Sequence, residues 1–311
     1  MIEKFIKKEI AKERLATLVC PIFRLYFRKF PLQFGKLTVW NKIVHKYLLW
    51  RPVDVVSVTE FGARFPGRLG TPLHGFLYFF GVFEPALTSY MRNWLRLGDV
   101  AIDVGANIGV HTVLLSRLVG PTGRVHAVEA SPSIFARLKE NLTRNGADNV
   151  VVHNVAVLDA PGTVSVFLHE ASNEGGTTVV QSEAERRDTS VEAIVAALPL
   201  DQIVPVEDLR RARLIKIDVE GAEWLVTRGM RSVLPTLAPD CAIIMEVTPT
   251  ALADFGASVD ALVAVFSEYG YRAFRFPDTF NPQAHMRPAA PLTPLTSTSF
   301  DIADLLFVRQ G

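Results

Sequence analysis

Short apolar runs alternate with helical patterns from residue 98 to the end of the chain. Residues 100–104 form a β-branched run, and the residues after Gly109 repeat their apolar positions at helical spacing. Seven strands are expected in this way, at residues 100–104, 124–128, 150–152, 214–218, 241–247, 271–276 and 304–308. Strands that alternate with helices predict an α/β fold with a mostly parallel sheet and helices on both faces. The last two runs predict a hairpin that makes one strand antiparallel.

The first 97 residues follow other patterns. Residues 2–19 place apolar side chains on one helical face and lysines around the rest, which predicts an amphipathic helix that ends at Pro21. Residues 53–83 indicate short strands and turns. We therefore expect three segments, which are a basic helical segment at 1–52, a small β/helical extension at 53–97 and the main domain at 98–311.

Charge is distributed unevenly between these segments. Residues 1–51 hold 12 Lys and Arg against 3 Asp and Glu, a net charge of +9, while the whole chain carries +1. Aromatic and basic residues interleave at 22–34, as in segments that lie on anionic membranes. Two interpretations stay open for residues 1–34, namely a helical cap packed on the protein and a peripheral contact with a membrane. Nucleic acid is not expected as a partner.

Cysteine usage and hydropathy bear on the compartment. Cys20 and Cys241 show no disulfide or metal spacing, which favours a reducing compartment. We expect neither a leader peptide nor a transmembrane helix, because the N-terminus lacks a continuous apolar core and no apolar run reaches about 20 residues. We expect a cytoplasmic protein, with the inner face of the membrane as a peripheral location.

The turn after residue 104 has the composition of a nucleotide-binding loop. Gly105 and Gly109 let the backbone approach a ligand closely, and the helix behind them presents N–H groups to an anion. Glu129 ends the second strand, 24 residues after Gly105. An acidic side chain at that position binds the ribose diol of an adenosine cofactor. The pattern predicts a Rossmann-like nucleotide site.

Two residues favour S-adenosylmethionine over a dinucleotide. Asn107 stands where the GxGxxG pattern has its middle glycine. Asp103 lies inside the strand, where burial of a carboxylate is costly unless a cation meets it. The ammonium group of an amino-acid-bearing cofactor is such a cation. An NAD-dependent oxidoreductase and a binding protein without activity remain alternatives.

A second acidic group follows the apolar run at 214–217. Asp218, Glu220 and Glu223 lie within six residues at the tip of the expected strand, the edge where open α/β sheets bind ligands. Lys216 shares a face with Asp218 by strand alternation and is expected to be its counter-ion. Glu223 has the alternative role of capping the next helix.

The two stretches together resemble one family. DVGANIG at 103–109 with HAVEASP at 126–132 resembles motif I of class I S-adenosylmethionine-dependent methyltransferases, and with KIDVEGAE at 216–223 it most resembles the FkbM type. The likeness spans roughly residues 81–247. It implies a donor site made of Glu84, Asp103, Gly105, Ala106, Asn107, Gly109, His111, Glu129, Ala130, Ser131, Asn154, Val155, Ala156 and Asp218. An alternative for Glu84 is a role at the start of a helix.

The resemblance implies a hydroxyl acceptor, which must lose a proton to a general base. Candidate bases are Asp218, Glu220, Glu246 at the end of the run at 241–247, and His111 in the first helical turn after Gly109. Asp218 and Glu220 are favoured. The same acids suit Mg²⁺, but no third ligand is evident from the sequence, so no metal is expected.

The sequence thus predicts an S-adenosylmethionine-dependent O-methyltransferase. The resemblance implies a small-molecule or glycan acceptor, that is, a hydroxyl on a sugar, glycolipid or secondary metabolite. N-methylation is the nearest alternative, because one fold supports both reactions. The Pro- and Thr-rich stretch at 277–299 is expected to be a loop, either a lid over the site or disordered.

Overall fold

The structure is a computed structural model that describes residues 2–30, 35–168, 177–187, 189–277, 281–287 and 291–309, the first 11 of these (2–12) by their backbone only. The chain divides into two compact units. The first consists of Met1–Thr88 and Thr279–Ala289, and the second of Ser89–Asp278 and Ala290–Gly311. No helix among the described residues is long and apolar enough to cross a bilayer.

The first unit packs helices around a two-stranded sheet. Helix α1 (Ile2–Lys29) continues through Pro21, so the predicted end at that residue is wrong. Proline removes one backbone N–H, and the helix tolerates this on an exposed turn. The other elements are α2 (Lys36–Val39), the π-helical η1 (Trp40–Leu48), β1 (Asp54–Val58), antiparallel β2 (Arg64–Arg68), α3 (Pro72–Phe79) and the start of α4 (Pro85–Trp94). Helix α3 replaces the strands and turns expected there.

Aromatic rings fill the core of this unit. Phe27, Trp40 and Phe79 are all less than a tenth exposed and meet edge to face. The ring of His285, in the short helix η4 (Pro282–His285), stacks on Phe76 with 4.4 Å between ring centroids. Burial lowers the pKa of His285 to about 4, so this ring packs as a neutral group. Part of the stretch expected to be a loop is thus a core element here.

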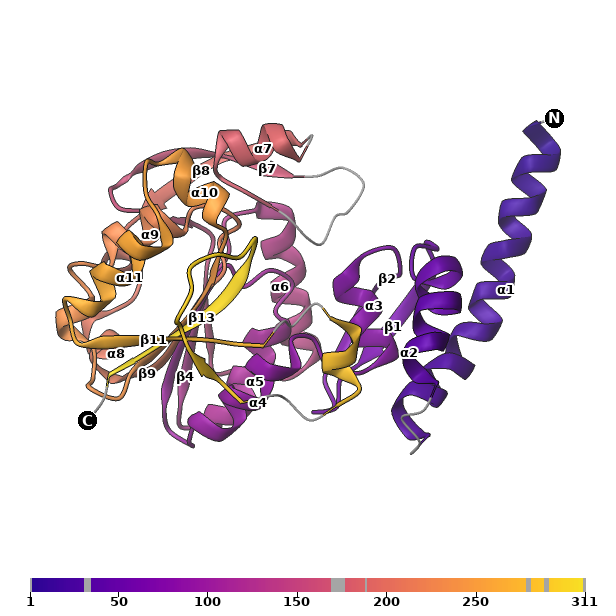
Figure 1. Cartoon of the computed structure of the whole chain (residues 1–311), viewed down its shortest axis with the longest axis horizontal. Coiled ribbons are helices and arrows are strands. Elements are labelled where there is room, and N and C mark those ends of the chain that lie inside the picture. The colour runs from indigo at the N-terminus through magenta and orange to yellow at the C-terminus, as the bar shows by residue number, and fades with distance from the viewer. Residues whose placement is uncertain are drawn as a thin grey trace. The chain divides into compact units, whose positions relative to one another are not determined.

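The second unit is built on a large sheet with the strand order β12-β11-β13-β10-β9-β3-β4-β5 (Figure 1). Its strands are β3 (Val100–Val104), β4 (Arg124–Val128), β5 (Val150–His153), β9 (Ala212–Ile217), β10 (Ala242–Val247), β11 (Tyr271–Arg275), β12 (Thr293–Pro294) and β13 (Ala303–Arg309). Seven correspond to the expected strands. The eighth, β12, is a two-residue strand that lies inside the proline-rich stretch and pairs with β11. Strand β13 runs antiparallel to β10 and β11, as the predicted hairpin requires.

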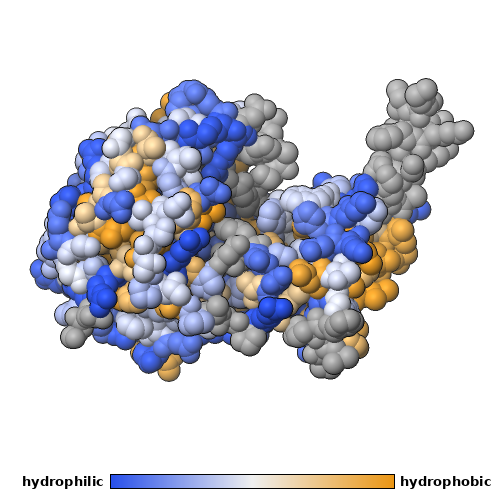
Figure 2. Space-filling view, in the orientation of Figure 1, coloured by the Kyte–Doolittle hydropathy of each residue, from blue (hydrophilic) through white to orange (hydrophobic). Residues whose placement is uncertain are grey.

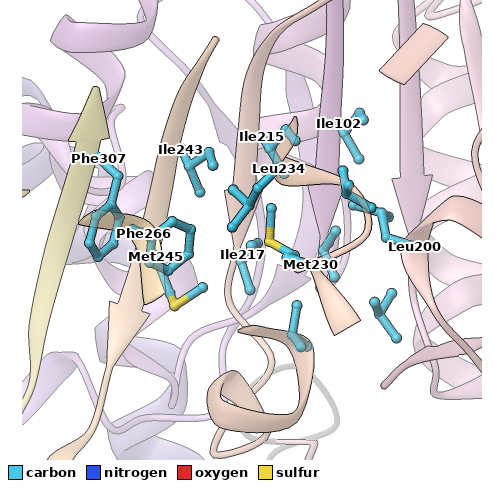
Figure 3. Packing of buried hydrophobic residues seen from close by; sticks show 14 of the residues in the cluster. Ile102, Leu200, Ile215, Ile217, Met230, Leu234, Ile243, Met245, Phe266 and Phe307 are labelled. Carbon is cyan, nitrogen blue, oxygen red and sulfur yellow. The ribbon is translucent and has the colours of Figure 1, made fainter. Parts of the chain in front are cut away.

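Helices cover both faces of this sheet. They are α5 (Val110–Val119), α6 (Pro132–Arg144), α8 (Val206–Arg211), α9 (Glu223–Gly229), α10 (Pro249–Asp254) and α11 (Val259–Ser267). Figure 3 shows Met230 and Phe266 packed against Ile217, Met245 and Phe307 on one face. Strand alternation turns Asp103 to the opposite face, where Thr112 of α5 meets it.

A second sheet has the order β6-β8-β7. Strand β7 (Gly162–Leu168) pairs antiparallel with β8 (Ser190–Leu198), and β6 (Ala156–Val157) lies parallel to β8. The alternating residues at 163–168 and the β-rich residues at 177–180 predict a hairpin with a turn at 173–176. The structure reduces this pairing to one bridge, between Phe167 and Thr178. Its expected turn at 173–176 lies outside the described residues. The main partner of β7 is instead the long strand β8. The polar residues just before β8 hid this strand in the sequence pattern.

Candidate functional site

The glycine turn joins β3 to α5 at the carboxyl edge of the large sheet. Gly105 has a φ of 80°, and a Cβ there would lie 1.7 Å from the carbonyl oxygen of Asp218. The turn and the end of β9 therefore touch at a point where only glycine fits. Asn107 has a φ of 50°, and its Oδ1 accepts a hydrogen bond from the N–H of Ile108 at 2.7 Å. Asparagine tolerates this left-handed conformation, so the turn closes without a middle glycine.

Glu129 folds back onto the turn from the end of β4. Its Oε2 accepts from the N–H of Asn107 and its Oε1 from the N–H of Ser131, both at 2.9 Å. Burial raises the pKa of Glu129 to about 7, and the two backbone hydrogen bonds only partly offset this effect. The carboxylate is held in one position and keeps lone pairs for a further donor.

Asp103 is buried beneath the same turn, at 1% exposure. Its Oδ2 accepts from the hydroxyl of Thr112 at 2.6 Å. Its Oδ1 is also buried and has no hydrogen-bond partner within the described ranges of the chain. Since an unsatisfied buried carboxylate oxygen is costly, this oxygen suits a bound cation or N–H donor.

A pocket opens at the carboxyl ends of β3, β4 and β9. It encloses about 590 Å³ of empty space, part of it open to solvent. Eight of the predicted residues line it, namely Gly105, Asn107, Glu129, Ala130, Val155, Ala156, Asp218 and Glu220. Its other walls come from residues that sequence reasoning missed: Val104, Val128, Val157, Val166, Thr177, Thr178, Val179 and Val219. The apolar walls beside a few carboxylates are typical of a small-molecule site.

Two acids at the end of β9 have different partners. Asp218 accepts a hydrogen bond from the buried Lys216 Nζ at 2.8 Å, which confirms the predicted counter-ion. Glu220 has a φ of 52° and pairs with Arg187 Nη1 at 2.7 Å. Burial first, and then the charge of Asp218, raise the pKa of Glu220 despite the nearby cations. The hydroxyl of Thr178 donates to the backbone carbonyl of Glu220 at 2.7 Å.

Arg187 is a residue of this site that sequence reasoning missed. It follows helix α7 (Gln181–Arg186), in the run of charged residues at 183–188. The composition of that run predicts a solvated loop, and the helix shows that this prediction is wrong. Glu183 of α7 is buried and lies 3.3 Å from Arg187 Nε. Burial lowers the pKa of Arg187, but the charges of Glu220, Glu183 and Glu246 outweigh burial and raise it. The pairing could not be found in the sequence, because 33 positions separate Arg187 from Glu220.

Other predicted residues support the pocket without lining it. Ser131 caps α6 by accepting from the N–H of Ile134 at 3.2 Å. Asn154 donates its side-chain amide to the carbonyl oxygens of Glu129 and Ala130, at 2.8 and 3.0 Å. These bonds hold the loop after β4, and with it the Glu129 carboxylate.

The remaining predicted residues are not among those that line the pocket. Ala106 and Gly109 belong to the turn, and His111 is buried in the first turn of α5. Glu246 is buried in β10. Glu84 belongs to the first unit, where it is buried and has a φ of 47°. Its backbone carbonyl accepts a hydrogen bond from the N–H of Thr88 at 2.9 Å, at the start of α4.

Comparison with known proteins gives consistent likenesses. A family model described as a methyltransferase FkbM domain matches residues 103–273. The chain is 28% identical over 145 residues to the hexuronic acid methyltransferase AglP of Haloferax volcanii, which covers 45% of this chain and 53% of that protein. It is 31% identical over 167 residues to the 31-O-demethyl-FK506 methyltransferase FkbM of Streptomyces tacrolimicus, covering 45% and 64%.

The match is partial in length for both relatives. The chain spans between about half and two thirds of each of them. Among solved structures, an S-adenosylmethionine-dependent methyltransferase from Aquifex aeolicus aligns with a TM-score of 0.41 and 13% identity, covering 72% of this chain and 88% of that one. The matched family region contains the glycine turn, Glu129 and the acids after β9.

Proposed function

The chain belongs to the FkbM family of methyltransferases, and on that premise we propose that it transfers a methyl group from S-adenosylmethionine to a hydroxyl of a sugar, glycolipid or secondary metabolite. One observation carries the proposal: a single pocket gathers the glycine turn, Glu129 and the acids that follow β9. The hexuronic acid and 31-O-demethyl-FK506 methyltransferases bear names that fit such acceptors.

The residues present fit the donor. The fixed carboxylate of Glu129 suits a ribose diol. The buried Oδ1 of Asp103 suits an ammonium group, because a cation would relieve its missing hydrogen bond. Val128, Val155 and Ala156 offer an apolar wall for an adenine ring. When bound, S-adenosylmethionine supplies an electrophilic methyl group on a sulfonium.

We assign the general base to Glu220. It lines the pocket, and burial raises its pKa, which makes its carboxylate a stronger proton acceptor than an ordinary one. Asp218 also lines the pocket. Each acid has a cationic partner, Lys216 for Asp218 and Arg187 for Glu220, so Asp218 is the alternative base. In this role the Glu220 carboxylate accepts the proton of the acceptor hydroxyl, and Arg187 orients the carboxylate. Glu246 stays a candidate, since a carboxylate oxygen of Glu246 lies within 4.8 Å of one of Asp218, and His111 is a candidate by sequence only.

The proposed partners are a small-molecule or glycan acceptor for the second unit and a lipid surface for the first. Catalysis without a metal, a cytoplasmic location and the roles of Glu84 and Asn154 at the donor stay predictions.

Calorimetric titration with S-adenosylhomocysteine, and in parallel with NADH, tests the donor site. We expect micromolar binding of S-adenosylhomocysteine alone, weakened at least about tenfold in Glu129→Gln and Asp103→Asn. Glu140→Gln is the matched control, because Glu140 is an exposed carboxylate on α6 away from the pocket lining. Preference for NADH, or no binding of either, would refute the proposal.

A further inference from the structure

Helix α1 turns an aliphatic face outward. Leu15, Leu18, Ile22 and Leu25 are 60%, 72%, 64% and 62% exposed. Their spacing of three, four and three residues places them on one side of the helix, which we call the aliphatic stripe. Figure 2 shows the corresponding orange atoms along the outer side of α1, next to its grey end. Four large aliphatic side chains exposed in one row are more than the scattered singles of an ordinary surface.

The opposite face of α1 fixes which side points outward. Ala16, Cys20 and Phe27 are 1%, 1% and 6% exposed in the core of the first unit. Near the end of the helix, Arg28 donates to the carbonyl oxygens of Val58 and Tyr78 at 2.6 and 2.7 Å. The helix cannot roll to bury the stripe without breaking these contacts, so the stripe belongs to the folded state.

This arrangement combines the two interpretations that the sequence left open, a helical cap packed on the protein and a peripheral contact with a membrane. The inner face of α1 is the packed cap. Phe27, one of the aromatic residues at 22–34 that suggested a membrane segment, lies in the core instead. The outward face is aliphatic, and it is available for a partner.

Charge indicates which partner fits. Residues 14–30 contain no acidic residue, and exposed Arg14 and Lys29 stand near the two ends of the stripe. The 51 N-terminal residues together carry a net charge of +9. Two copies docked stripe to stripe would bring two such segments together, and like charges oppose that contact. Anionic lipid headgroups would be attracted instead.

The helix η1 and the turn after it, which holds Trp50, add a second exposed surface of the same chemistry. Ile43, Tyr47 and Trp50 are 39%, 53% and 52% exposed, beside the exposed Lys42 and Lys46. Tyr and Trp are the residues that favour the headgroup level of a bilayer, and lysine stems reach from the apolar layer to the phosphates.

We propose that the aliphatic stripe of α1 inserts into the interfacial layer of an anionic lipid bilayer, so that the protein lies on the membrane without crossing it. The stripe belongs to the first unit alone, and its binding to lipid does not depend on the methyltransferase activity. The chemistry recognised is an acyl-chain boundary under negatively charged headgroups.

Vesicle flotation of the full chain tests the proposal. The vesicles contain phosphatidylcholine alone or phosphatidylcholine mixed with phosphatidylglycerol. The double variant L18S/I22S removes the centre of the stripe. V191S/I194S is the matched control, because Val191 and Ile194 are 57% and 71% exposed on β8 of the second unit. Far-UV circular dichroism verifies that both variants fold.

We expect the wild type and V191S/I194S to float with the anionic vesicles, and L18S/I22S to partition at least about tenfold more weakly. Added salt is expected to weaken the binding. Equal flotation with neutral vesicles, equal loss in the control, or no flotation at all would each overturn the proposal. A dimer in solution that L18S/I22S dissociates, without lipid binding by the wild type, would assign the stripe to a second copy instead.

Discussion

Replacement of Gly105 by alanine perturbs the contact on which the pocket depends. The turn after β3 approaches the end of β9 so closely that an added Cβ would meet the Asp218 carbonyl oxygen at 1.7 Å. That oxygen belongs to the backbone, so it cannot rotate away as a flexible side chain would. The turn and the strand end must separate, and both carry pocket-lining residues.

The loss of unfolding free energy expected for Gly105→Ala has two separable causes. An alanine at a φ of 80° costs about 1–2 kcal/mol in the left-handed region. Forcing the backbone apart adds about 1–3 kcal/mol, as overpacking in cores does. Gly146→Ala is the matched control, since Gly146 has a φ of 62° and nothing within 4 Å of its added Cβ. The control therefore measures the conformational effect alone.

Urea denaturation followed by circular dichroism, with titration of S-adenosylhomocysteine, measures both consequences. We expect Gly105→Ala to lose about 2–5 kcal/mol of unfolding free energy and at least about tenfold in ligand affinity. Gly146→Ala should lose about 1–2 kcal/mol and bind normally. Equal losses in the two variants, with binding retained in Gly105→Ala, would refute the view that this close approach shapes the pocket.

Three further outcomes are expected. The pKa values of Glu129 and Glu223 are raised to about 7 in the folded state. Between about pH 4 and about pH 7 the folded state therefore binds protons that the unfolded chain has released. The unfolding free energy should fall as the pH rises through this range. Glu129→Gln should flatten that slope in pH-dependent urea titrations; an unchanged slope would contradict the shift. Glu220→Gln should lower kcat by about 10²–10⁴-fold while the affinity for S-adenosylhomocysteine stays constant, and an unchanged kcat would remove Glu220 as the base. Lys216→Met should lower the unfolding free energy of the protein by about 1–2 kcal/mol, since it leaves the Asp218 carboxylate without its partner at 2.8 Å. In a double-mutant cycle, addition of Asp218→Asn should recover part of this loss. Strictly additive losses would show that the two residues are not coupled.

The strands of the large sheet were predictable because each carries its signal locally. The runs at 100–104 and 124–128 have the bounds of β3 and β4, since buried parallel strands are continuous apolar runs that end at glycine or polar residues. The pairing of Lys216 with Asp218 was predictable for the same reason, because strand alternation puts positions two apart on one face.

Elements whose stability comes from distant partners were not predictable. Helix α7 forms in a charged run in which Arg186 pairs with Asp254 and the following Arg187 pairs with Glu220, 68 and 33 positions away. Strand β8 begins among polar residues and pairs with β7, about 30 positions earlier in the chain. No local pattern reports such pairings, since the energy of burial depends on which surfaces meet.

The sequence by itself determined the order of strands and helices in the main domain, the glycine turn and the acidic residues at two strand ends. Periodicity, turn chemistry and charge are local properties of the chain. Only the tertiary structure decided that Glu129 closes onto the Asn107 N–H, that Arg187 meets Glu220 and that Phe27 is core while Leu18 faces outward. A long-range contact requires a particular partner residue and a particular face of the helix or strand. Both arise when the chain packs, because the same amphipathic pattern is compatible with either face buried until a specific surface covers one of them.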